Sequence, residues 1–295
     1  MGFGRGFERF VVADTDRRPR RPWLVAFLPW LFARSDAALL FDDKAGLTVV
    51  SEALRFLGGQ ERRGAFVFIN VMEPHLPYLP PRRFLSRLEG SGWDADSLAR
   101  LDQSRLRDLK PGGERTAREI EGLRLLYAAE VAYCDRLVAR LVERLEASKR
   151  LEGTILVLTS DHGENLGQHA PLDHQLGLYD TLLRVPLIVR WPPRFAAGTH
   201  AEGLVSLADL PGALLELAGV EESLPPARVT AATGPPIASR DGDPRALFDP
   251  ALRDGVFFEY DRPGHILDLI RRDLGIDPKP WDRSLAPSQA RRNQG

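Results

Sequence analysis

The sequence predicts an α/β fold in which helices cover a mostly parallel sheet. Two apolar runs, Ala65–Met72 and Thr154–Thr159, have the composition of strands buried on both faces. Between them, Glu114–Lys149 repeats apolar residues every three or four positions, which is typical of a long helix. A strand, a helix and a second strand in this order favour a parallel crossover.

The bulk composition allows one large α/β domain, alone or with a smaller companion. The chain has 295 residues, 43% of them hydrophobic, and a net charge of −1, so nothing favours a nucleic acid as partner. The single cysteine, Cys134, excludes an internal disulfide and a cysteine-based metal site. Because Cys134 lies on the apolar stripe of the long helix, we interpret it as a core residue and not as a nucleophile.

The first elements lead to a stiff loop. Thr48–Leu57 has helical spacing and is followed by Gly58 and Gly59, which predicts a helix with a glycine stop. The strand predicted at Ala65–Met72 runs into Glu73–Pro81, a loop with four prolines. His75 would then stand on a rigid loop at the carboxyl end of a strand, although a surface histidine in a proline turn is the simpler interpretation.

The second half of the chain predicts fewer elements. Asp209 is a candidate N-cap for a helix at Leu210–Ala218, and Gly219 would end that helix. Gly255–Tyr260 could form an edge strand, and the polar segment Trp281–Gly295 is expected to be frayed.

One apolar segment raises the question of a membrane. Pro22–Ala33 follows a basic run but is too short to span a bilayer. It also lacks the layout of a signal peptide, so a packed surface segment or a mobile lid is the favoured interpretation. We therefore expect a cytoplasmic location ahead of export, and no membrane span.

Polar residues crowd the segment after the second predicted strand. Asp161 and His162 follow Thr154–Thr159 directly, and His169 and His174 come soon afterwards. In a turn, a carboxylate and an imidazole side by side can reach one divalent cation. A zinc site built from these four residues is an alternative, but the helical spacing of two zinc-binding histidines is missing.

Two histidines suggest chemistry on an anion. His75 and His174 could hydrogen-bond an oxyanion or give a proton to a leaving group. The simpler interpretation is that Asp161 caps a turn and that the histidines are solvated.

Five segments in this order resemble the sulfatase family of the alkaline-phosphatase superfamily, over about Ala65 to Val220. They are MEPHLPY, YAAEVAYCDRLV, TSDHGENLGQH, HQLGLYDTLLRVPLIVRWP and VSLADLPGALLELAGV. The resemblance implies an α/β sandwich around a mixed, mostly parallel sheet. It also implies a divalent metal, calcium first and magnesium or manganese otherwise, at the carboxyl edge of that sheet.

The resemblance also assigns roles to residues. Asp161 and His162 occupy the positions of the second pair of metal ligands, where relatives often carry asparagine in place of the histidine. His75 matches a histidine that contacts the sulfate or the leaving oxygen. His174 falls where many relatives place a lysine that binds the transferred group, and His169 matches a frequent loop histidine, a weaker candidate for substrate binding.

The chain departs from the family at the nucleophile. Sulfatases oxidise a cysteine or serine of a Cys/Ser-x-Pro-x-Arg motif to formylglycine, and neither Cys134 nor any serine begins such a motif here. Asp42 and Asp43 lack the long strand that should precede the first pair of metal ligands. The expectation is an amino-terminally truncated member, with no nucleophile and half of the metal site.

Three segments are expected in such a chain. Residues 1–64 would be a remnant of the amino-terminal part of the sulfatase domain, 65–220 the α/β core, and 221–295 a loop-rich, incomplete small domain. The leading hypothesis is a sulfatase-like hydrolase whose isolated chain has negligible activity, with a small sulfate or phosphate ester as substrate if it is complemented. The alternatives are a phosphate or phosphonate monoester hydrolase, and a noncatalytic binding protein that self-associates through an exposed sheet edge.

Overall fold

A computed structural model describes most of residues 43–220 and short segments outside that range. The described residues are 7–12, 43–59, 64–85, 91–104, 113–168, 172, 174, 177–201 and 203–220, with the backbone alone at 255–258 and 290–293. The predictions for Pro22–Ala33 and His169 lie outside these residues.

The chain forms two compact units. Unit 1 comprises residues 1–105 and 114–151, and unit 2 comprises residues 106–113 and 152–295. The division falls inside the predicted core segment 65–220, at the end of the long helix. Each unit is described by itself below.

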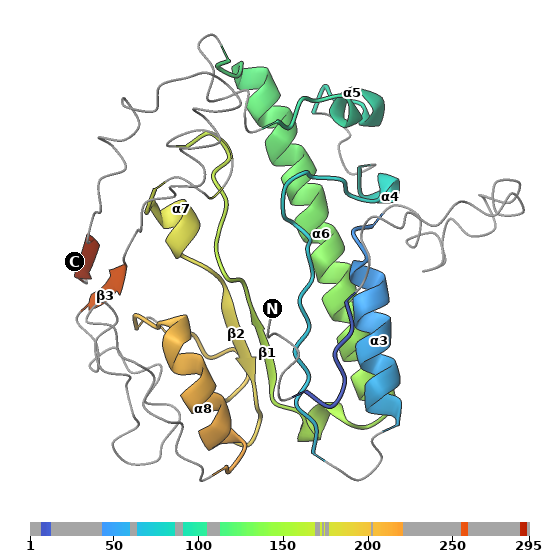
Figure 1. The fold of residues 1–295 in the computed structure, drawn as a ribbon, viewed down its shortest axis with the longest axis vertical. Helices are drawn as coiled ribbons and strands as arrows, with labels where there is room; N and C mark the ends of the chain where they lie inside the picture. Colours follow the sequence, from blue (N-terminus) through green and yellow to red (C-terminus); the bar gives the residue numbers. More distant parts are fainter. Residues whose placement is uncertain are drawn as a thin grey trace, which may run out of the picture. The chain divides into compact units, whose positions relative to one another are not determined.

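Unit 1 is built around two helices that lie side by side (Figure 1), α3 at Gly46–Gly58 and α6 at Ala117–Ala147. Both helices were predicted, and Gly59 follows α3 as the sequence indicated. The short helices α4 (Arg82–Leu85) and α5 (Ala95–Ala99) also pack on α6.

The long helix α6 begins at a capping box and buries a mixed stripe. Thr116 and Glu119 satisfy each other's backbone N–H groups, which fixes the start of the helix. The buried side of α6 consists of Gly122, Leu123, Leu126, Ala129, Glu130, Tyr133, Leu137 and Leu145. Val131 fits the apolar spacing of the predicted helix but is exposed, and Glu130 lies on the buried face instead.

The segment Ala65–Met72 is extended but is not a strand. No described residue pairs with its backbone as a strand would. Phe66 and Phe68 are 67% and 72% exposed, so the prediction of a strand buried on both faces is wrong for the described residues. A run of β-branched and aromatic residues favours extended backbone, but only neighbouring strands complete a sheet.

Unit 2 contains a two-stranded sheet. After the 3-10 helix Leu151–Gly153, strand β1 (Leu156–Thr159) pairs with β2 (Leu187–Arg190). The pairing is antiparallel, with Val157 opposite Val189, which a mixed sheet allows. The parallel partner predicted for β1, residues 65–72, is not a strand in the described part of the chain. Among the described residues β1 has one partner strand, and Ile188 on β2 is 58% exposed, so these strands are not buried on both faces there.

The remaining elements of unit 2 follow in order. Helix α7 (Asp180–Leu183) precedes β2, and the 3-10 helix η4 (Leu207–Asp209) leads into α8 (Leu210–Leu217). Helix α8 was predicted, but the Asp209 side chain does not cap it. Asp209 is instead the buried last residue of η4, whose own cap is Ser206.

Strand β3 (Gly255–Phe258) confirms the predicted edge strand. It pairs antiparallel with β4 (Ala290–Asn293), inside the segment that was expected to be frayed.

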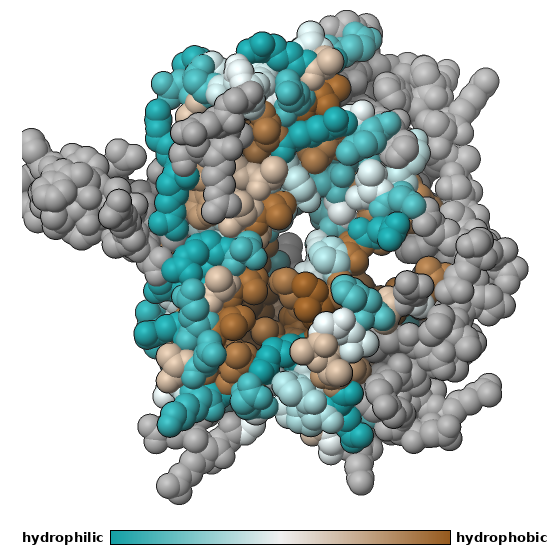
Figure 2. Space-filling view, turned by 180° about the vertical axis from the view of Figure 1, so that it is seen from behind, coloured by the Kyte–Doolittle hydropathy of each residue, from teal (hydrophilic) through white to brown (hydrophobic). Residues whose placement is uncertain are grey.

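Hydrophobic side chains also reach the surface, as brown areas among the teal ones in Figure 2. In unit 1 the large exposed apolar residues include Phe7, Phe10, Val11, Val12, Phe66, Phe68 and Met72. None of the helices in the described parts of the chain is long and apolar enough to cross a membrane.

Candidate functional site

The turn that follows β1 in unit 2 places Asp161 and His162 together. His162 Nδ1 lies 2.7 Å from the carbonyl oxygen of Gly163, which accepts its proton, so the neutral ring carries its lone pair on Nε2. That Nε2 lies 3.8 Å from Asp161 Oδ1. The Asp161 side chain is 90% exposed, so its carboxylate stands in water while the imidazole is half-buried.

Gly163 lets this turn pack tightly against α7. Its N–H donates to the carbonyl oxygen of Leu182 over 2.8 Å. A Cβ at Gly163 would collide with the backbone carbonyl oxygen of Thr181. Only glycine fits there, which explains why the Asp-His pair is followed by a residue without a side chain.

His174 lies against the same turn. Its ring stacks on that of His162, with centroids 3.9 Å apart and planes 20° apart. Oε1 of the buried Glu164 carboxylate lies 3.5 Å from His174 Nδ1. Beside it, Thr181 donates to Asn165 Oδ1 over 2.5 Å. The structure thus brings Asp161, His162 and His174 into one cluster.

The donor set of this cluster fits a divalent cation in part. His162 Nε2 and Asp161 Oδ1 lie 3.8 Å apart, so both could contribute to one cation. Two protein ligands do not complete a tight site for a hard cation, which takes six or more donors. Among the residues that the structure describes, no group of three or more His, Cys, Asp or Glu side chains could hold a metal ion.

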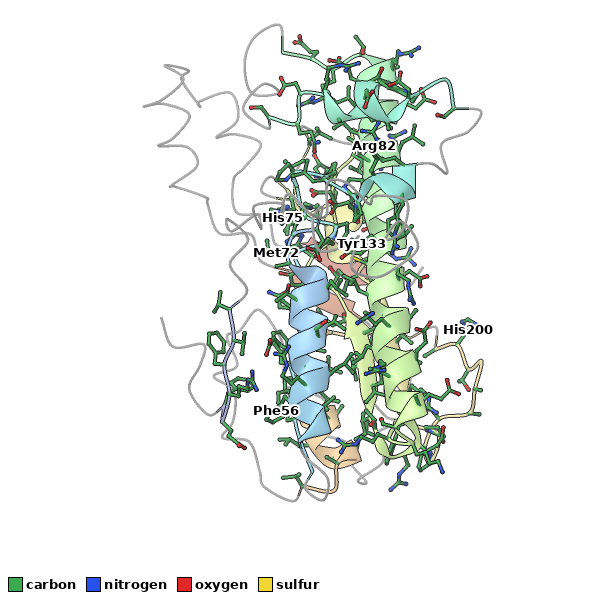
Figure 3. The ribbon with its side chains drawn as sticks, turned by 90° about the vertical axis from the view of Figure 1, so that its right-hand side faces the viewer. Phe56, Met72, His75, Arg82, Tyr133 and His200 are labelled. Carbon is green, nitrogen blue, oxygen red and sulfur yellow. The ribbon has the colours of Figure 1, made fainter. Side chains whose placement is uncertain are left out.

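His75 belongs to unit 1 and stands on the proline-rich loop, as predicted. Figure 3 shows Met72 and His75 beside the end of α3 at which this helix begins, at the level of Tyr133 on α6. His75 Nδ1 lies 2.5 Å from the carbonyl oxygen of Leu76, so the neutral ring carries its lone pair on Nε2. The peptide bonds before Pro74 and Pro77 are cis.

A buried polar cluster holds this loop. Lys44 pairs with Glu130 over 2.6 Å, and Tyr133 donates to Asp43 over 2.7 Å. Burial raises the pKa of Glu130 to about 7 against the opposing effect of Lys44, and burial also raises the pKa of Glu73. A glutamate at an apolar helical position was the only available signal.

Cys134 does not have the properties of a nucleophile. Burial, with the nearby carboxylates of Glu73 and Glu130, raises the pKa of its thiol to about 12. At neutral pH the reactive thiolate is therefore scarce. Cys134 is only partly buried, however, so its interpretation as a core residue is not confirmed.

The chain has the alkaline-phosphatase-like α/β fold that solved structures of sulfatases share. A solved structure in complex with its substrate D-glucosamine-2-N,6-O-disulfate matches with a TM-score of 0.59 and 19% identity, over 84% of this chain and 59% of that chain. A phosphonate monoester hydrolase of Agrobacterium radiobacter matches with a TM-score of 0.58 and 21% identity, over 77% and 47%. Both likenesses show the fold alone.

The model of the Sulfatase family matches residues 4–220, and the chain belongs to this family. N-acetylglucosamine-6-O-sulfatase of Bacteroides thetaiotaomicron is 31% identical over 184 residues, 62% of this chain. Human arylsulfatase K is 31% identical over 108 residues, 37% of this chain. The chain spans about a third of the length of the first relative (31%) and a fifth of the second (20%). The roles of His75, Asp161, His162, His169 and His174 stay predictions.

Proposed function

We propose that this chain supplies the metal-binding and anion-binding residues of a metal-dependent sulfuric ester hydrolase. One observation carries the proposal, the approach of His162 Nε2 to Asp161 Oδ1 at 3.8 Å in the turn after β1. A divalent ion, calcium first and magnesium or manganese otherwise, would be held there and would stabilise negative charge on a bound ester.

The histidines of each unit would act on an ester anion, as their positions in the family imply. His174, stacked on His162 and backed by Glu164, can donate to an oxyanion when its ring is protonated. His75, and His169 as the weaker candidate, would hydrogen-bond the anion. We assign proton donation to the departing alcohol to His75 or His174.

The nucleophile is not among these residues. The 295 residues contain no Cys/Ser-x-Pro-x-Arg motif, and the Cys134 thiol is held in its unreactive form. We therefore expect negligible turnover of an aryl sulfate by this chain alone, whichever divalent metal is added. Turnover of an aryl sulfate by the purified chain, without a second polypeptide, would contradict the proposal that this chain lacks the nucleophile.

Manganese provides a test of the metal site that is independent of activity. Paramagnetic Mn²⁺ broadens the NMR signals of nearby protons, and the six histidines can be followed one by one. Submillimolar Mn²⁺ should broaden the His162 and His174 ring signals well before that of exposed His200. This selectivity should disappear in Asp161→Asn and persist in His200→Ala. Equal broadening of His162 and His200, or unchanged selectivity in Asp161→Asn, would overturn the metal assignment.

A phosphate or phosphonate ester is the second candidate substrate. The phosphonate monoester hydrolase of Agrobacterium radiobacter matches the fold about as well as the disulfate-bound structure does. Both anions are tetrahedral, and a cation with donor histidines suits either. Titration with inorganic sulfate and inorganic phosphate, followed at the His174 ring signals, compares them, and tighter binding of phosphate would favour the second candidate.

A noncatalytic binding protein is the third hypothesis. The exposed side chains of Phe66 and Phe68 favour it, because a selected binding surface would expose such residues. A soluble chain that melts cooperatively is required for this role. An insoluble or molten chain would exclude it.

A further inference from the structure

Lys44, which no sequence motif singles out, lies at the centre of the polar cluster in unit 1. Its backbone N–H donates to Glu73 Oε1 over 2.8 Å, and its ammonium group donates to Glu130 Oε2 over 2.6 Å. The ammonium group also donates to the carbonyl oxygen of His75 over 2.5 Å. Lys44 therefore joins the segment before α3, the middle of α6 and the loop that carries His75.

Glu130 bonds to the same loop beyond His75. Its Oε1 accepts the backbone N–H of Leu79 over 2.5 Å, while its Oε2 accepts from Lys44. The ion pair thus holds the loop at two points, the carbonyl group of His75 and the N–H of Leu79. Gln103 adds a third attachment between them, since its side chain bonds to both the N–H and the carbonyl group of Tyr78.

Burial indicates that this ion pair does more than add stability. The Lys44 side chain is 14% exposed and that of Glu130 is 0% exposed. Removing two such ions from water is costly, so an apolar pair of similar volume would often be at least as stable. What an apolar pair lacks is directional bonding to the loop backbone, and that is what Lys44 and Glu130 provide.

The start of α3 is shaped to admit the loop. A Cβ at Gly46 would lie 2.8 Å from Glu73 Oε2 and 2.6 Å from Leu137 Cδ1. The absence of a side chain at Gly46 therefore lets the carboxylate of Glu73 lie against the first turn of the helix, directly beside Lys44.

We propose that Lys44 and Glu130 are positioning residues, which fix the backbone from Glu73 to Leu79 and thereby set where the His75 imidazole stands. They act through the loop and do not themselves meet a substrate. The catalytic importance of this arrangement rests on the role proposed for His75 above, whereas the mechanical claim about the loop does not.

Hydrogen exchange of the full chain, measured at pH 8, tests this claim. In Lys44→Met and Glu130→Gln, the peptide covering residues 73–81 should exchange at least tenfold faster, whereas peptides from the middle of α3 and α6 should keep their rates. The control is Arg9→Ala, which breaks an exposed ion pair with Glu52 in the same unit and should change none of these rates. Unchanged exchange in the loop, or equal acceleration in the loop and both helices, would overturn the proposal.

If either single variant fails to fold, the double variant Lys44→Met/Glu130→Gln provides the test. Removing both members of the ion pair leaves neither charge buried without its partner. Its loop should exchange at least tenfold faster than that of the wild type, and the His75 ring signals should shift while those of His162 stay in place. A loop as protected as in the wild type would overturn the proposal. The Mn²⁺ experiment can fail independently of this result, which distinguishes the two proposals.

Discussion

Glu130 lies on the buried face of α6, and both of its carboxylate oxygens accept hydrogen bonds, from Lys44 and from Leu79. The groups that act on its charge are Lys44, which favours the ionised form, and Glu73, which opposes it. Because burial is the largest of these effects, it raises the pKa of Glu130 to about 7.

This raised pKa predicts a stability that decreases as the pH rises. The folded state holds the proton of Glu130 more tightly than the unfolded chain, whose pKa is about 4.5. The resulting stabilisation is complete below about pH 4.5 and is lost as the pH approaches 7, at roughly 1 kcal/mol per pH unit. Urea unfolding should show this slope between about pH 5 and pH 7 and level off above it, and Glu130→Gln should flatten it.

The control for this measurement is Glu146→Gln, on the exposed side of the same helix. This variant should retain the wild-type slope. The assignment to Glu130 fails if Glu130→Gln and Glu146→Gln depend on pH to the same extent.

At the scale of the elements, the turn after β1 depends on its contact with α7. Gly163 touches the backbone of Thr181, so Gly163→Ala must push the turn and helix apart. Overpacking of this kind costs about 1–3 kcal/mol, and the stacking of His162 on His174 should be lost with it. Thermal unfolding and the ring signals of the two histidines measure both effects.

The matched control is Gly212→Ala on α8, where a Cβ meets nothing within 4 Å. It should change stability little, or raise it slightly, because alanine favours a helix. If Gly163→Ala is as stable as Gly212→Ala and keeps the histidine signals, the contact with α7 does not hold the turn.

The helices could be predicted from local sequence patterns. The sheet, and the Lys44–Glu130 pair that holds the His75 loop, could not. Spacing and a glycine stop were enough for α3 and α6, because both depend on residues close in the chain. The strand predicted at 65–72 failed because a strand requires partners that the run itself cannot specify. Glu130 was missed because a glutamate within a helical pattern normally faces water, and its partner Lys44 is 86 residues away.

The candidate site residues were predicted from family motifs, and the spacing of polar residues alone would not have identified them. Adjacent Asp161 and His162 suggested a shared ion, and the structure brings His174 onto the same turn. The stacking of the two rings could not be predicted from spacing, because it depends on the path of the chain between them.

At the scale of the whole molecule, the exposed apolar residues of unit 1 predict self-association. Phe66 and Phe68 lie two residues apart in an extended segment, which places them on the same side of it. We expect copies of the chain to associate through this face, and Phe66→Ser/Phe68→Ser to shift sedimentation toward the monomer at equal concentration.

Val131→Ser is the control, because Val131 is an exposed apolar residue on the same unit but on a helix. It should leave the sedimentation profile unchanged. Association that persists in the double phenylalanine variant would place the contact elsewhere on the molecule.

The pairing of Lys44 with Glu130 also predicts how these two positions vary among related sequences. Loss of one charge alone leaves the other buried without its partner, at a cost of about 3–5 kcal/mol, whereas loss of both removes that penalty. The two positions should therefore covary among related sequences, although 86 residues separate them. Related sequences that keep only Lys44 or only Glu130 should be rarer than those that keep both or neither.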